Sequence, residues 1–153
     1  MLKQIKSKKE QGFTIIEVLI VLAIAGLILL VVFLAVPALQ RNSRNTTYKN
    51  EASQLLSAAT EFVSNNNGTT PVNNNKAAIL ALTKNKTITD LTVTGATTEQ
   101  TPSLSAAVLV TGRKCGAANG DKYGTDQAGT RSLALIYGIE NSSGTVVAQC
   151  IEG

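Results

Sequence analysis

The stretch KKEQGFTIIEVLIVLAIAGLILLVVFLAVP, residues Lys8–Pro37, decides how the rest of this chain is organised. From Val18 to Val36 it contains no charged residue, which is long enough for an α-helix that crosses the hydrocarbon core of a bilayer. One charged residue, Glu17, lies at the start of this uncharged run. A carboxylate inside a membrane helix is costly, so its presence indicates a function.

The basic character of the chain is concentrated before this run. Residues 1–12 carry four lysines and one glutamate, so they contribute +3 of the formal net charge of +4. Two small basic clusters follow the apolar run: Arg41, Arg44 and Lys49, and then Arg113 with Lys114. Charges this dispersed are typical of a solvated surface. Binding to DNA, which requires several phosphate contacts, is the weaker interpretation.

A basic start followed by an apolar run also fits a secretory signal peptide. Such a signal has an apolar core of about 7–15 residues, followed by a small-residue cleavage site. Here the apolar core runs from about Phe13 to Leu39, so we expect a spanning helix that stays on the mature chain. The lysines before it favour a cytoplasmic N-terminus, because positive residues flanking membrane helices tend to remain on that side.

The junction KKEQG–FTIIEV resembles the N-terminus of a type IV prepilin. The family pattern is a short basic leader ending in glycine, then phenylalanine, then a small residue such as threonine, then glutamate at the fifth mature position, then an apolar helix. Gly12, Phe13, Thr14 and Glu17 match this pattern residue by residue. The resemblance implies that a prepilin peptidase cleaves between Gly12 and Phe13 and then methylates the new amine of Phe13.

The position of Glu17 suggests an ion pair with that amine. Residues four apart in a helix share one face, as Phe13 and Glu17 would, and a buried charge is tolerated when it is paired. The residues alone do not show whether this ion pair forms within one chain or between two chains. Another alternative is that Glu17 only extends toward the lipid headgroups. The resemblance implies a pair between neighbouring subunits, in which Glu17 sets their stagger in a filament.

The chain becomes amphipathic after Pro37. Apolar residues recur three and four positions apart: Tyr48, Ala52, Leu55, Ala59 and Phe62, widened by Leu56 and Val63. Polar residues lie between them: Lys49, Glu51, Gln54, Ser57 and Glu61. This period predicts a helix that buries one face and ends in the Asn- and Gly-rich stretch Ser64–Pro71. We therefore expect four parts: a leader (1–12), an apolar helical half (13–39), an amphipathic helical half (40–64) and a globular head (65–153).

The head is expected to complete an α+β fold, with a small antiparallel sheet of about four strands packed on the long helix. A short helix is predicted first, at Lys76–Lys84. Alternating and β-branched residues then predict four strands: Thr87–Gly95, Ser105–Thr111, Ser132–Glu140 and Thr145–Ile151. The NSSG sequence between the last two is typical of a hairpin turn. The family resemblance implies the same architecture, a long helix with a sheet on its outer half.

Two cysteines, Cys115 and Cys150, lie in the head. An even pair in an exported domain indicates a disulfide, and two buried free thiols are the alternative. Two sulfurs without any histidine are too few for a zinc site, and Asp121 and Asp126 fall short of the roughly six to eight oxygens that calcium takes. No metal or cofactor is therefore expected. Asn-x-Ser/Thr triplets, which arise by chance in so Asn- and Thr-rich a chain, begin at Asn45, Asn67, Asn85 and Asn141.

The chain lacks the residues of an enzyme active site, since it has no histidine and no phosphate-binding loop. The resemblance implies a structural subunit of a type IV pilus, in the inner membrane before assembly and in an extracellular filament afterwards. Its implied partners are copies of itself, a prepilin peptidase, a platform membrane protein and a cytoplasmic assembly ATPase.

A pseudopilin of a type II secretion or competence system is the alternative. A membrane-anchored binding domain is a third, but an anchor gains nothing from Glu17. The residues do not choose among adhesion, twitching motility and DNA uptake.

Overall fold

The computed structural model describes residues 12–95, 102–116, 123–127, 129 and 131–153, with the backbone alone over 123–127. The elements are α1 (Ile15–Asn65), a short 3-10 helix η1 (Asn73–Asn75), α2 (Lys76–Leu82), β1 (Asp90–Thr94), β2 (Ala106–Thr111), β3 (Arg113–Cys115), β4 (Tyr123–Gln127), β5 (Leu133–Glu140) and β6 (Val146–Glu152). The chain divides into two compact units, one ending at Leu39 and the other running from Gln40 to Gly153. Helix α1 belongs to both.

In the second unit, α1 buries the apolar stripe that its sequence predicts. The side chains of Tyr48, Ala52, Leu55 and Ala59 are all buried. The helix ends at Asn65, inside the predicted stop. There the N–H of Gly68 donates to the carbonyl of Val63 at 2.8 Å, and the residue before it, Asn67, has a φ of 55°. A left-handed residue followed by this bond is a Schellman end, which satisfies carbonyls that the helix leaves free.

The main sheet has the strand order β1-β2-β5-β6 and confirms the α+β fold class. The pairs β2–β5 and β5–β6 are antiparallel, as predicted, whereas β1 and β2 are parallel, with Leu91 opposite Ala107. The expectation of a wholly antiparallel sheet was therefore wrong for this pair. Antiparallel neighbours need only a short turn, but residues 95–105 separate β1 from β2, which is enough chain to return to the starting end of the sheet.

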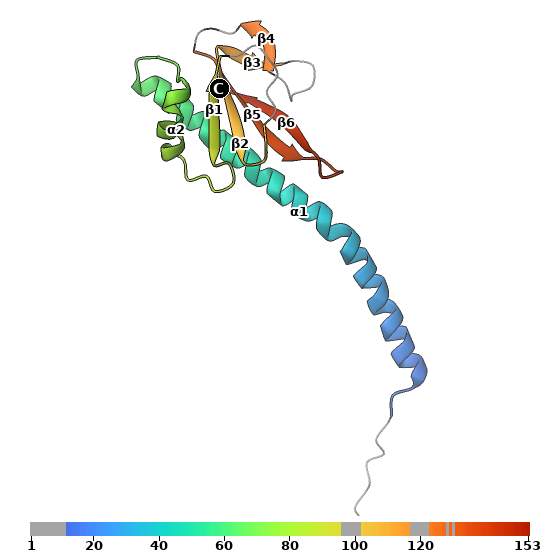
Figure 1. Ribbon diagram of the computed structural model, residues 1–153. Coiled ribbons are helices and arrows are strands. Elements are labelled where there is room, and N and C mark those ends of the chain that lie inside the picture. Colours follow the sequence, from blue (N-terminus) through green and yellow to red (C-terminus); the bar gives the residue numbers. More distant parts are fainter. Residues whose placement is uncertain (1–11, 96–101, 117–122, 128, 130) are drawn as a thin grey trace, which may run out of the picture. The chain divides into compact units, whose positions relative to one another are not determined.

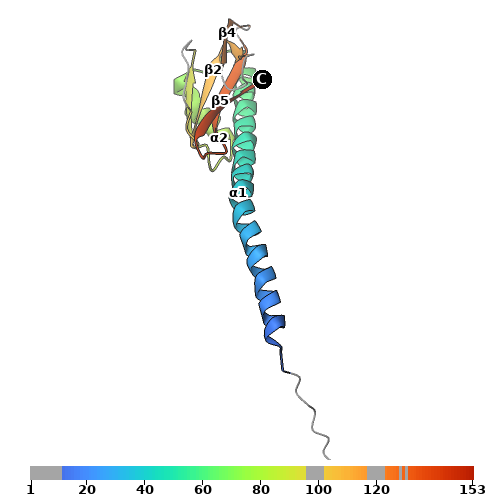
Figure 2. The ribbon, with the colours of Figure 1, turned by 90° about the vertical axis from the view of Figure 1, so that its right-hand side faces the viewer.

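Helix α1 packs on one face of this sheet, so the second unit has a helical layer and a sheet layer (Figure 1, Figure 2). Leu109 of β2 and Leu135 of β5 join the large cluster beneath the helix, and neither is exposed. On the other face, Val108, Val110 and Ile136 form a smaller buried cluster. Central strands buried on both faces read as continuous apolar runs, which is why the sequences of β2 and β5 do not alternate.

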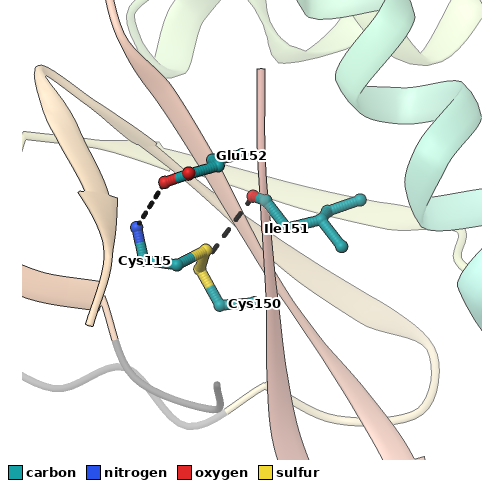
Figure 3. The surroundings of a disulfide bond; sticks show 4 residues. All are labelled: Cys115, Cys150, Ile151 and Glu152. Atoms are coloured by element: carbon teal, nitrogen blue, oxygen red, sulfur yellow. Dashed lines mark hydrogen bonds between the residues drawn. A yellow bond between two sulfur atoms is a disulfide. The ribbon is translucent and has the colours of Figure 1, made fainter. Parts of the chain in front are cut away.

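The two-stranded sheet β3–β4 was not predicted. Strand β4 lies in a segment for which the sequence analysis predicted no strand, because its Gly and Asp residues have a low preference for strands. A disulfide joins Cys115 of β3 to Cys150 of β6, across a sequence separation of 35 (Figure 3). Closing a loop of this length stabilises a fold by about 3–4 kcal/mol in the chain-entropy model. The N–H of Cys115 also donates to the Glu152 carboxylate at 3.2 Å, so β3 is joined to β6 twice.

Candidate assembly site

The N-terminal unit presents an apolar surface without a covering layer. Every described side chain from Gly12 to Leu39 is exposed, including Phe13 at 87% and Phe33 at 75%. Within the described residues, α1 contains a window of 18 residues that is apolar enough to cross a membrane. Apolar surface of this extent is a site of contact with lipid or with another protein. Pro37 lies inside α1, so it does not end the helix.

Glu17 and Thr14 form a capping box at the start of α1. The N–H and the hydroxyl of Thr14 both donate to Oε2 of Glu17, at 2.9 and 2.7 Å. In return, the N–H of Glu17 lies 3.4 Å from the Thr14 hydroxyl. The sequence Thr-x-x-Glu is the pattern of such a box, in which each side chain satisfies a backbone N–H that the helix start leaves free. The glutamate thus has a local partner that the sequence analysis missed, although its spacing was visible.

The start of α1 removes the helical basis for an ion pair between Phe13 and Glu17 of the same chain. Helix α1 begins at Ile15, so Phe13 precedes the helix and does not share a helical face with Glu17. The Glu17 oxygen that the capping box occupies is Oε2, whereas Oε1 receives no hydrogen bond from another described residue. The carboxylate is therefore held in place with one oxygen available to a second cation.

Glu51 forms a second carboxylate site, in the interior of the second unit. Its oxygens accept bonds from the N–H groups of Lys86, Thr87 and Ile88, at 2.7 to 3.2 Å. Burial alone would raise the pKa of this carboxyl, but the bonds from Ile88, Lys86 and Thr87 together outweigh it and lower the pKa. The sequence placed Glu51 among the polar residues between the apolar positions, yet it is only 9% exposed. The N–H groups of three consecutive residues compensate for the burial of the Glu51 carboxylate. No periodicity in the sequence indicates such backbone donors.

Glu140 at the end of β5 connects the sheet to α1. Arg44 donates to both of its carboxylate oxygens, at 3.1 and 2.6 Å. The side-chain amide of Asn45 donates to the Glu140 carbonyl at 2.7 Å and accepts from its N–H at 2.9 Å. The hydrogen bond from Arg44 lowers the pKa of Glu140 against the effect of desolvation, and the charges of Arg44 and Arg41 add to it.

The structure places the remaining predicted residues without joining them into a site. Of the basic clusters, Arg44 (paired with Glu140), Lys49 and Lys114 are exposed as expected, whereas Arg113 is buried. Residues 1–11 of the leader and Asp121 lie outside the described part, and the side chain of Asp126 is not described. In the described part, no group of three or more His, Cys, Asp or Glu residues gathers as metal ligands do. The amide of Asn45 is engaged with Glu140, which argues against its modification.

The comparisons with known proteins concern the same N-terminal segment. The family model of the prokaryotic N-terminal methylation motif matches residues 7–33. This match includes the Gly12–Phe13 junction, the capping box and most of the exposed apolar run. The head lies outside it. Neither a curated protein nor a solved structure matches the chain.

Proposed function

We propose, from the type IV pilin-like prepilin segment that this chain carries, that the protein is a structural subunit of a type IV pilus. The observation that carries the proposal is the methylation motif on a helix whose apolar side chains are exposed around one carboxylate. In a filament, copies of the same helix would cover this surface. Nothing in the described site suggests catalysis, and the family to which the motif belongs is structural.

The proposed route begins in the inner membrane. A prepilin peptidase removes residues 1–12 by cleaving after Gly12, and it methylates the amine of Phe13. The apolar half (13–39) remains in the bilayer until a platform protein and an assembly ATPase extract it into the filament. The amphipathic half (40–64) and the head (65–153) then form the outer part of each subunit. The exposed apolar helix and the basic leader support this route.

Glu17 would act at the moment of docking. An incoming subunit brings a positive Phe13 amine into an apolar bundle, where an unpaired charge is strongly unfavourable. The Glu17 carboxylate of a neighbouring copy compensates that charge only at one stagger, so the pair selects the register. The capping box supports this role because it fixes the Glu17 side chain and leaves Oε1 available.

Thr14 should therefore position Glu17, and its replacement tests this. Thr14→Val keeps the side-chain shape and removes the hydroxyl that donates to Glu17. We expect several-fold fewer filaments, because the free carboxylate then samples other rotamers. Thr14→Ser is the matched control and should assemble normally, since serine caps as well as threonine. Wild-type filament yield from Thr14→Val would remove Thr14 from the mechanism.

The proposed function is tested by N-terminal mass spectrometry on protein sheared from the cell surface. A chain that begins at N-methylated Phe13 and is recovered in sheared fibres is the expected result. A processed chain found only in membranes would instead support a pseudopilin. A chain that begins near Leu39, or that retains Met1, would contradict cleavage after Gly12.

A further inference from the structure

The exposed side of α1 in the second unit carries few charges for a helix surface. We call its exposed positions the outer helix face: Lys49, Asn50, Ser53, Gln54, Ser57, Thr60, Glu61 and Ser64. Its charged members are Lys49 and Glu61, which have opposite signs. Neither forms an ion pair with another described residue. A helix face that stays in water usually has a denser set of charged side chains.

The hydroxyl groups of this face are already satisfied. Ser53, Ser57, Thr60 and Ser64 each donate to the carbonyl four residues earlier in α1, at 2.9 to 3.0 Å. These hydroxyl donors would therefore keep their hydrogen-bond partners if another protein covered the face. Desolvation is costly mainly for polar groups that lose their hydrogen bonds, so this surface is inexpensive to bury.

Grooves flank the outer helix face on both sides. The groove between α1 and α2 has a volume of about 460 Å³ and includes Leu82, which is 52% exposed. The groove between α1 and β6 has a volume of about 470 Å³ and includes Ile151. Ser53 and Ser57 line both grooves and form the low ridge between them. A ridge of small side chains between two grooves is a shape on which a second helix packs closely.

We propose that the outer helix face binds α1 of a second copy of this chain, with Lys49 of one copy paired with Glu61 of the other. The proposal rests on the function proposed above and names a contact within that filament. Charge complementarity identifies the occupant, because each copy offers one cation and one anion. Helix α1 also carries the exposed apolar run, so the same helix would contribute to both contacts.

The spacing of the two charges fixes how the copies lie. Twelve residues separate Lys49 from Glu61, which in an α-helix is about 18 Å along the axis and about 120° around it. The two side chains thus lie toward opposite edges of the face. Opposite edges meet when two helices are parallel, as the e and g positions do in a parallel coiled coil. The copies are therefore parallel and offset by about 18 Å at this contact.

Charge reversal tests this contact. Lys49→Glu and Glu61→Lys should each reduce the yield of sheared filaments by about tenfold or more, because like charges then meet across the contact. The double variant restores opposite charges and should recover most of the wild-type yield. Lys114→Glu, an exposed reversal on β3 with the same change in net charge as Lys49→Glu, is the control and should assemble normally.

The result that overturns the inference is a pair of single variants that assemble like wild type, or a double variant that stays defective while Lys114→Glu assembles. Membrane fractions containing the processed chain distinguish these results from a failure to fold or insert. If the wild-type chain forms no filament at all, the proposed function fails, and the assigned partner fails with it.

A zero-length carbodiimide cross-link provides a second measurement. It joins a lysine amine to a carboxylate only when the two touch, and about 18 Å of helix separates Lys49 from Glu61 within one chain. We expect treated wild-type filaments to give a ladder of covalent multimers and a peptide joining Lys49 to Glu61. Both should be lost with Lys49→Arg, which keeps the charge but lacks the reactive amine. A ladder without the Lys49–Glu61 peptide would contradict the assigned contact.

Discussion

Replacing Glu17 by alanine is expected to abolish filaments while leaving the protein processed and in the membrane. The substitution leaves the proposed Gly12–Phe13 cleavage site and the apolar run that would insert in the bilayer unchanged. Under the proposed function, the substitution removes the charge that would compensate the Phe13 amine of the next subunit, whose burial without a partner is strongly unfavourable. The measurements are the yield of sheared filaments and the N-terminal mass of the membrane-bound chain.

Two further substitutions distinguish charge from capping. Glu17→Gln keeps an acceptor at the third helical position, so the helix can still be capped, but it removes the negative charge. We expect it to fail as alanine does. Val18→Ala, the neighbouring substitution in the apolar run, should assemble. Filaments formed by Glu17→Gln would show that the local bond to Thr14 explains the residue, and that no ion pair is needed.

Replacing Glu51 by alanine should destabilise the second unit by about 2–4 kcal/mol, because it leaves the buried N–H of Ile88 and the partly buried N–H groups of Lys86 and Thr87 without acceptors. The carboxylate joins α1 to the chain segment between α2 and β1, so its loss also frees that segment. Chemical unfolding of the full chain in detergent, followed by a probe of the head, measures the change. Glu61→Ala is the control on the same helix and should have little effect, since Glu61 is exposed. A head of wild-type stability without Glu51 would contradict this account of the fold.

The same carboxylate gives the stability of the head a defined pH dependence. The pKa of Glu51 is lower in the folded chain than its ordinary value of 4.5. As the pH falls, Glu51 therefore binds a proton in the unfolded chain before it does so in the folded chain. The stabilisation that the ionised carboxylate provides is present above pH 4.5, and it is lost as the pH falls through the lower pKa of the folded chain. Glu140, whose pKa Arg44 lowers, adds an effect of the same sign. Glu51→Gln should have a shallower loss of stability between neutral pH and about pH 3.

The parts of this fold that could be predicted are those with a local signal. The apolar run, the stripe at Tyr48–Phe62 and the β-branched strands each depend on residues a few positions apart, and all appear in the structure. The capping box of Thr14 and Glu17 also has a local signal, the Thr-x-x-Glu spacing, although the sequence analysis did not use it. For the same reason, the Asn-rich stop of α1 was found within two residues.

What could not be predicted depends on groups far apart in the chain. Glu51 is compensated by backbone donors more than thirty positions later, and a backbone N–H has no sequence signature. Arg113, expected at the surface, is buried. The parallel pairing of β1 with β2 joins residues sixteen positions apart, such as Asp90 and Ala106. Strand β4 forms because β3 lies beside it, although its own residues favour a loop.

The central claim is that Glu17 of one subunit pairs with the Phe13 amine of another. Electron cryomicroscopy of sheared filaments, at a resolution that places side chains, tests it most directly. We predict that the methylated Phe13 nitrogen lies within about 4 Å of a Glu17 oxygen from a neighbouring copy, the distance of an ion pair. A filament in which every Glu17 carboxylate contacts only its own chain, or in which the Phe13 amine lies apart from any carboxylate, would contradict the claim.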